Sequence, residues 1–239
     1  MKMKVRNKAA WSDAVTPLEE KNKQVSYEAA TEAIVLLEDD GSLPVEPGKI
    51  ALYGSGADKT IKGGTGSGEV NERHAISIME GLEMAGFTIT TKSWIEEYQR
   101  RFEEKEDEYR KTFRDSLLKG NIKNIMGVLT IPFQYPFDQA VIGEDINKSD
   151  TDTCVYVVAR LAGEGADKKL DGSEYALTRE EKANIAFCAA NYKKMILVIN
   201  VGSTFDMSFL DEIEGINAVV YFCQQGTMGG KAFADLLCG

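Results

Sequence analysis

The sequence predicts an α/β fold: a three-layer sandwich in which a mostly parallel sheet of five or six strands has helices on both faces. Short runs almost continuous in Val, Ile, Leu and Tyr recur at 49–53, 154–159, 195–201 and 218–223, as expected for parallel strands buried on both faces. Segments with helical spacing lie between them, so strands and helices alternate as in βαβ units. A length of 239 residues suits one large open sheet, and a single domain is predicted over residues 1–239.

The amino-terminal part predicts a helix followed by a β-α-β unit. Five apolar residues between positions 24 and 38 fall on one helical face, and the turn residues at 39–44 end that helix. These five are Val25, Ala29, Ala33, Leu36 and Leu37. The run 49–53 is predicted as a buried strand, and a helix over about 74–85 with a strand over 87–91 completes the unit.

The middle of the chain is more charged. Residues 94–119 are rich in Glu, Lys and Arg with aromatic residues at helical spacing, which predicts a long solvent-exposed helix. Residues 132–149 have no sustained period, and an irregular loop is predicted there. Beyond the strand at 154–159, Thr178 and Glu181 form a capping-box pattern that predicts a helix to about Tyr192. Later helical segments are expected at 206–213 and 229–237.

Composition narrows the class of partner. A formal net charge of −10 and a pI near 4.8 disfavour nucleic acid and anionic membranes, because both are bound by concentrated Lys and Arg. The basic residues at 1–8 are followed by Trp11-Ser12-Asp13 rather than by an apolar signal core, and no run approaches the roughly 20 apolar residues of a membrane span. A cytoplasmic protein with a neutral ligand, and with neither nucleic acid nor membrane as partner, is expected.

No metal or cofactor site is predicted. The cysteines Cys154, Cys188, Cys223 and Cys238 are far apart and lie in or beside apolar runs, so buried free thiols are expected rather than a zinc site. The lone histidine, His74, has no partner at the spacing of a catalytic triad and is interpreted as a surface or capping residue.

Glycine-rich segments follow the predicted strands. The densest spans 54–68, directly after the strand at 49–53, where close backbone approach would let it form the wall of a binding site. It lacks the Lys-Ser/Thr ending of a phosphate-binding P-loop and the third glycine of a dinucleotide fingerprint, which disfavours a nucleotide. A purely structural turn is the other interpretation that these residues leave open.

Three further loop clusters are expected at the same edge of the sheet. The cluster at 163–168 places Glu164 between two glycines just beyond the strand at 154–159. A carboxylic acid there suits general acid catalysis, because burial on substrate binding raises its pKa toward the working pH; a solvated loop charge is the alternative. Clusters 200–203 and 224–230 follow the last two strands, with helix capping as their alternative role. Parallel strands end at one edge, so all four loops are expected to converge there.

Taken in order, these motifs resemble the α/β sandwich domain of glycoside hydrolase family 3, which includes many β-glucosidases and β-xylosidases. The resemblance spans nearly the whole chain, and the expected arrangement of the sheet is flavodoxin-like. The motifs are Glu32-Ala33-Ile34-Val35-Leu36-Leu37, Gly41-Ser42-Leu43-Pro44, Gly54-Ser55-Gly56-Ala57, Lys62-Gly63-Gly64-Thr65-Gly66-Ser67-Gly68, Gly163-Glu164-Gly165-Ala166-Asp167-Lys168, Leu177-Thr178, Asn200-Val201-Gly202 and Gly229-Gly230.

The resemblance implies a division of the active site between two domains. In that family the nucleophile is an aspartate on a separate (β/α)₈ barrel, and the acid/base is a glutamate on a loop of the sandwich domain. A retaining exo-β-glycosidase is therefore implied, of β-glucosidase or β-xylosidase type, with Glu164 as acid/base and Asp167 or Glu174 as the next candidates. The implied carbohydrate subsite consists of Lys62, Gly63, Gly64, Thr65, Gly66, Ser67 and Asp167. No metal or cofactor is implied.

The chain contains no such barrel, so it is expected to be inactive without one. Residues at about 96–149 are expected to be a charged helical insertion in the domain. The segments 172–175 and 224–230 depart from the usual motifs of the family, which affects the expected subsite contacts. Two other functions stay open: a non-catalytic flavodoxin-like module that binds a ligand or nucleotide, and an interaction domain whose charged helix docks another chain.

Overall fold

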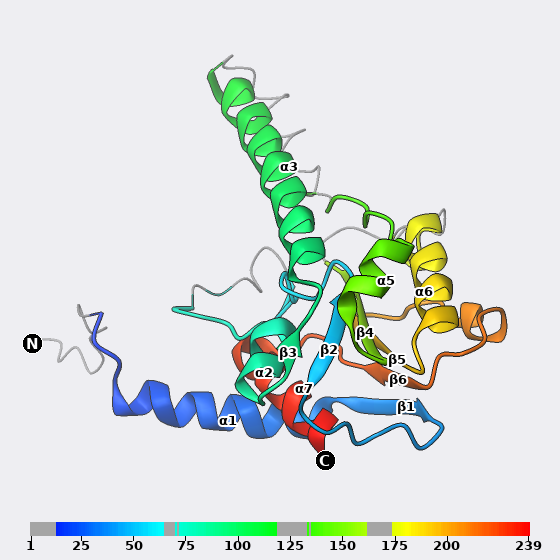
Figure 1. Ribbon diagram of the computed structural model, residues 1–239. Helices are drawn as coiled ribbons and strands as arrows, with labels where there is room; N and C mark the ends of the chain where they lie inside the picture. The colour runs from blue at the N-terminus through cyan, green and yellow to red at the C-terminus, as the bar shows by residue number, and fades with distance from the viewer. Residues whose placement is uncertain (1–12, 65–69, 71, 119–132, 134, 162–173) are drawn as a thin grey trace, which may run out of the picture.

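One mixed sheet organises the molecule. The computed structural model describes residues 13–64, 70, 72–118, 133, 135–161 and 174–239 (Figure 1). Within them a six-stranded sheet runs in the order β1-β6-β5-β4-β2-β3. Its strands are β1 Val35–Asp39, β2 Lys49–Tyr53, β3 Thr88–Ile89, β4 Thr153–Arg160, β5 Lys194–Val201 and β6 Ala218–Tyr221. Every neighbouring pair is parallel except β1 and β6, which confirms the mostly parallel sheet.

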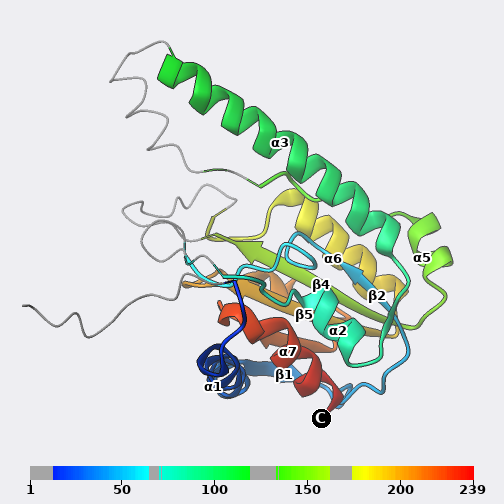
Figure 2. The same cartoon turned by 90° about the vertical axis from the view of Figure 1, so that its left-hand side faces the viewer.

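Helices cover both faces of this sheet, as predicted. In Figure 2, α3, α5 and α6 lie on one face and α1, α2 and α7 on the other. Their bounds are α1 Pro17–Ala33, α2 Ile78–Met84, α3 Lys92–Leu118, α5 Gly143–Ser149, α6 Arg179–Asn191 and α7 Gly229–Cys238, with 3₁₀ turns η2 Ser208–Asp211 and η3 Gly226–Met228. Because both faces are covered, the central strands are buried almost throughout: residues 154–158 of β4 and 195–199 of β5 have no exposed surface.

The first predicted helix, over about 24–38, is confirmed as far as Ala33 but not beyond it. The structure begins α1 at Pro17, after Thr16, whose side chain and that of Glu19 form a capping box, and ends it at Ala33. Residues 34–38, predicted to continue the helix, instead lead into strand β1, which pairs antiparallel with β6 at the edge of the sheet. Val35, Leu36 and Leu37 are each about half exposed. Pairing with β6 therefore decides the conformation of this segment, and the helical spacing extends past Ala33 only by coincidence.

Smaller differences concern the ends of elements. The helix expected from 74 begins at Ile78, because the Ser77 hydroxyl accepts a hydrogen bond from Glu80 N (3.1 Å). The loop expected at 132–149 contains the short helix α5, which the Asp145 carboxylate caps by accepting from Ile142 N (2.9 Å). Two elements are shorter than expected, the strand β3 and the segment 206–213, which holds only the turn η2. A single helical turn has too few residues to leave a periodic pattern.

The long charged helix is confirmed as α3. Its first turns bury Trp94, Ile95 and Tyr98 in the core, and Figure 1 shows the rest of the helix leading away from the sheet. This part carries exposed ion pairs within the helix, among them Arg100 with Glu97 and Arg110 with Glu106. Such pairs add only tenths of a kcal/mol each, so the buried aromatic turns fix the helix to the domain.

Helices α2 and α7 touch through glycine. A Cβ atom built on Gly81 of α2 would lie 2.0 Å from the carbonyl oxygen of Gly230 in α7. We expect Gly81→Ala to lower the free energy of unfolding by about 2–3 kcal/mol, since two backbones must separate, although alanine favours a helix. Chemical denaturation measures this change. Gly143→Ala is the matched control, because a Cβ there meets nothing within 4 Å; equal stability of the two variants would contradict the prediction.

Candidate functional site

The carboxyl ends of β2, β4, β5 and β6 meet at one edge, and Asn200 near the end of β5 joins the loops there. Its side-chain Oδ1 accepts from Ile61 N (2.6 Å), and its Nδ2 donates to Ile61 O (2.8 Å) and to Cys223 O (2.6 Å). The side chain is fully buried. Asn200 thus ties the loop after β2 to the loop after β6, and the predicted convergence of these clusters is confirmed.

The start of the first glycine-rich segment is shaped by β4. Gly54 has a φ of +92°, and a Cβ there would lie 2.3 Å from the carbonyl oxygen of Val157. Gly56 N donates to the same oxygen (3.2 Å). Glycine is therefore needed at position 54 because two backbones approach closely there. This agrees with the structural-turn interpretation for this part of the segment.

The predicted sugar-binding motif begins at Lys62, whose backbone and side chain are both held. Its carbonyl oxygen accepts from Gly226 N (2.9 Å), and its ammonium donates to Val70 O (3.0 Å) and pairs with the Glu72 carboxylate. The hydrogen bond from Lys62 holds the pKa of Glu72 below its ordinary value. Lys62 therefore links the start of the segment 62–72 to Val70 and Glu72 at its other end. Gly63 and Gly64 follow it with intermediate exposure, whereas Thr65, Gly66 and Ser67 lie outside the described residues.

The second predicted loop leaves the sheet at the end of β4. Glu164 and Asp167 lie outside the described residues; Glu174, the other candidate, is half-buried in the turn that leads to α6. The described flanks meet at Arg160, the last residue of β4. Its guanidinium donates to Ala159 O (2.8 Å) and to Ala176 O (3.0 Å), and it forms a two-pronged pair with the Glu181 carboxylate (2.7 and 2.5 Å).

A buried carboxyl group lies near this ion pair. Asp138 is 5% exposed, and its carboxylate accepts a hydrogen bond from the Tyr156 hydroxyl. Burial, and then the negative charge of Glu181, raise the pKa of Asp138 to about 7, although the Tyr156 hydrogen bond and the Arg160 charge act in the opposite direction. Asn184 joins the cluster, because its Nδ2 contacts the Tyr156 hydroxyl (3.3 Å).

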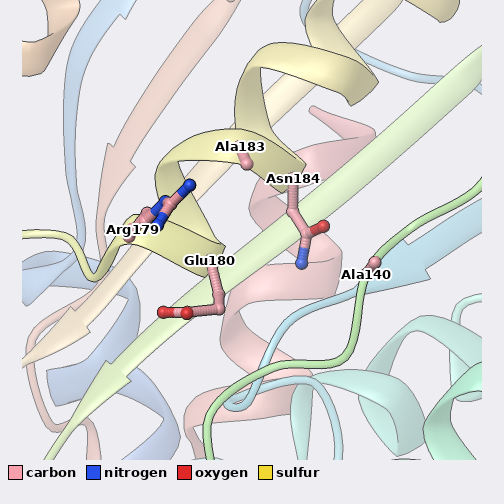
Figure 3. Close-up of a pocket in the computed structure, with 5 residues that line it drawn as sticks. All are labelled: Ala140, Arg179, Glu180, Ala183 and Asn184. Carbon is pink, nitrogen blue, oxygen red and sulfur yellow. The ribbon is translucent and has the colours of Figure 1, made fainter.

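A small cavity lies beside the same helix. Figure 3 shows its lining residues, with Arg179, Glu180, Ala183 and Asn184 on the first turns of α6 and Ala140 on the segment before α5. Its volume is about 180 Å³, below the several hundred Å³ usual for ligand pockets. The predicted site residues that the structure describes, Lys62, Gly63 and Gly64, do not line it, and we do not place the sugar there.

Comparison with known proteins decides the family. The model of the glycosyl hydrolase family 3 C-terminal domain matches residues 34–239. The chain belongs to glycoside hydrolase family 3. Similar curated proteins are beta-glucosidase A of Butyrivibrio fibrisolvens, 28% identical over 249 residues (92% of this chain, 27% of the relative), and the beta-glucosidase of Ruminococcus albus, 30% identical over 217 residues (89% and 21%).

Solved structures agree with the family. Beta-glucosidase 3B of Thermotoga neapolitana, solved in complex with glucose, is 29% identical with a TM-score of 0.71 over 94% of this chain and 30% of that one. A beta-glucosidase of Paenibacillus barengoltzii, 24% identical with a TM-score of 0.69 over 91% and 23%, shares the fold. The family 3 domain described here therefore spans about a quarter of the length of the curated relatives it matches.

The carboxyl edge of this family 3 domain has unused hydrogen-bonding capacity. In the part of the chain that the structure describes, five buried side-chain atoms have no hydrogen-bond partner. Those at or next to the carboxyl ends of β2, β4, β5 and β6 are Ser55 Oγ, Arg160 Nε, Ser203 Oγ and Gln224 Nε2. Buried polar atoms are normally paired, so these four atoms at the carboxyl edge are exceptions to that rule.

Two further sequence predictions concern membrane spans and the cysteines. Among the described residues, no helix combines the length and the apolar character that a membrane span requires. The four cysteines are free, but only Cys154 and Cys188 are buried; Cys223 and Cys238 are partly exposed.

The residues that sequence analysis missed are Asp138 and the pairing of Arg160 with Glu181. A lone arginine just after an apolar strand was the available signal for that pair.

Proposed function

We propose that this chain forms the acid/base half of the active site of a retaining exo-β-glycosidase, with Glu164 as acid/base. A β-glucoside is the proposed substrate, since the similar curated proteins are beta-glucosidases. One observation carries the proposal. Ala159 and Asn200 are paired in register across β4 and β5, and Asn200 binds Ile61, so the segment with Lys62 and the segment with Glu164 start from adjacent points of one edge.

The proposed reaction is a double displacement. The protonated Glu164 gives its proton to the glycosidic oxygen as the C–O bond breaks, while a carboxylate of a separate barrel domain forms a bond to the anomeric carbon. Glu164, now ionised, takes a proton from water, and that water attacks the anomeric carbon and releases the barrel carboxylate. The two carboxyl groups would stand about 5–5.5 Å apart across the sugar. The proposed sugar subsite is Lys62 to Ser67 with Asp167.

This division of labour predicts that the chain alone does not hydrolyse glycosides. We expect the purified 239-residue chain to release no 4-nitrophenol from 4-nitrophenyl β-glucoside above a buffer blank, because an acid without a nucleophile cannot complete the reaction. A complete enzyme that contains the chain should turn over the same substrate. Hydrolysis by the chain alone at the rate of the complete enzyme would show that the nucleophile lies within these residues.

A further inference from the structure

The Arg160–Glu181 ion pair connects both ends of the segment that carries Glu164. Arg160 ends β4, and its guanidinium donates to Ala176 O, beyond the segment, at 3.0 Å. Glu181 receives both prongs of the guanidinium and also accepts from Thr178 N at 2.8 Å, within the capping box of α6. The end of β4, the residues before α6 and the first turn of α6 are thereby fixed to one another.

The surroundings of the Arg160–Glu181 pair hold it in one geometry. The Arg160 and Glu181 side chains are only 11% and 4% exposed, and the Arg160 guanidinium lies 5.4 Å from the centre of the Phe205 ring. A planar guanidinium with two parallel hydrogen bonds holds its partner in one orientation, which an ammonium does not. Buried ion pairs often stabilise a fold no better than apolar residues of similar volume, so stability alone is a weak reason for this arrangement.

Three residues separate Arg160 from Glu164 in the sequence. A general acid acts only when its carboxyl group is within hydrogen-bond reach of the departing oxygen, and a misplacement of about 1 Å costs on the order of 10²-fold in rate. The direction in which the chain leaves Arg160 therefore limits the positions that the Glu164 carboxyl group can reach.

We infer that Arg160 and Glu181 are positioning residues for Glu164: they fix the two ends of its loop and do not themselves contact substrate. This inference rests on the proposed function. It predicts a selective defect, because kcat/KM reports the first bond-breaking step and only substrates with poor leaving groups need the acid in that step.

The test is kinetic, in a complete enzyme that contains this chain. We expect Arg160→Met to lower kcat/KM for an alkyl β-glucoside by roughly 10²-fold, and for 2,4-dinitrophenyl β-glucoside by less than about 3-fold. Arg160→Lys should not restore the alkyl glucoside rate, since an ammonium cannot replace the two-pronged pair. Lys182→Met on the same helix, which breaks the exposed pair with Glu212, is the matched control and should change neither rate.

Folding is separated from positioning by a second variant. Arg160→Met leaves Glu181 buried without its partner and is therefore strongly destabilising, whereas Arg160→Met/Glu181→Met replaces the pair by apolar side chains that a core accepts. The folded double variant should show the same selective loss. If Glu164→Gln is selective but the double variant lowers both rates equally, the positioning role is wrong and the proposed function stands. If Glu164→Gln itself lowers kcat/KM for both substrates equally, the proposed function and the positioning role are both wrong.

Discussion

Glu164→Gln, in a complete enzyme that contains this chain, is expected to lower kcat/KM for an alkyl β-glucoside by about 10²–10⁴-fold, the usual contribution of general acid catalysis. Glutamine keeps the size of the side chain but has no proton to give to the leaving oxygen. For 2,4-dinitrophenyl β-glucoside, whose leaving group departs without a proton, kcat/KM should change by less than about 10-fold. Initial rates across a series of leaving groups measure the difference.

The second half of the reaction supplies an independent control. Hydrolysis of the glycosyl intermediate needs a base, so kcat on the activated substrate should also fall in Glu164→Ala, and added azide, which attacks without a base, should restore it and yield a β-glucosyl azide. Glu174→Ala is the matched variant, because Glu174 lies in the described turn beyond the loop. Azide rescue in Glu174→Ala but not in Glu164→Ala would move the acid/base role to Glu174.

The parallel part of the sheet could be predicted because its signal is local. Strands such as β4 and β5 are buried on both faces and are therefore continuous apolar runs, whose carboxyl ends meet at one edge. Asn200 fell within a predicted loop cluster for the same reason. Strand β1 could not be predicted in this way, because its conformation depends on pairing with β6, about 180 residues later in the sequence.

The ion pair and the buried carboxyl group of the candidate site could not be predicted from a sequence pattern either. Glu181 was predicted only as a capping residue, and it does accept from Thr178 N, yet it also binds Arg160 twenty-one residues earlier. Asp138 lay in a segment predicted as an irregular loop, where nothing marked it as buried. Such contacts between distant residues depend on how α6 packs against β4, which no local spacing records.

Asp138→Asn is expected to make the protein more stable at neutral pH and to flatten its pH dependence. In the folded protein the pKa of Asp138 is about 7, raised from an ordinary value of 3.8 first by burial and then by the charge of Glu181. Between these two values the folded state keeps a proton that the unfolded state releases, so stability falls as pH rises from about 4 to about 7. At about 1.4 kcal/mol for each pH unit, the loss approaches roughly 4 kcal/mol.

Denaturant unfolding of both proteins at pH 4, 6 and 8 measures this effect. The stability of Asp138→Asn relative to the unmodified protein should rise from pH 4 to about pH 7 and then level off, since an amide cannot ionise but can still hydrogen-bond the Tyr156 hydroxyl. Asp152→Asn, which removes an exposed carboxylate paired with Lys193, should leave the pH dependence unchanged. A constant difference between Asp138→Asn and the unmodified protein at every pH would mean that Asp138 is already ionised in the folded state. Among the residues that the structure describes, a protonated Asp138 leaves Glu181 as the negative partner of the Arg160 guanidinium, so the two charges of this pair balance while Asp138 holds its proton.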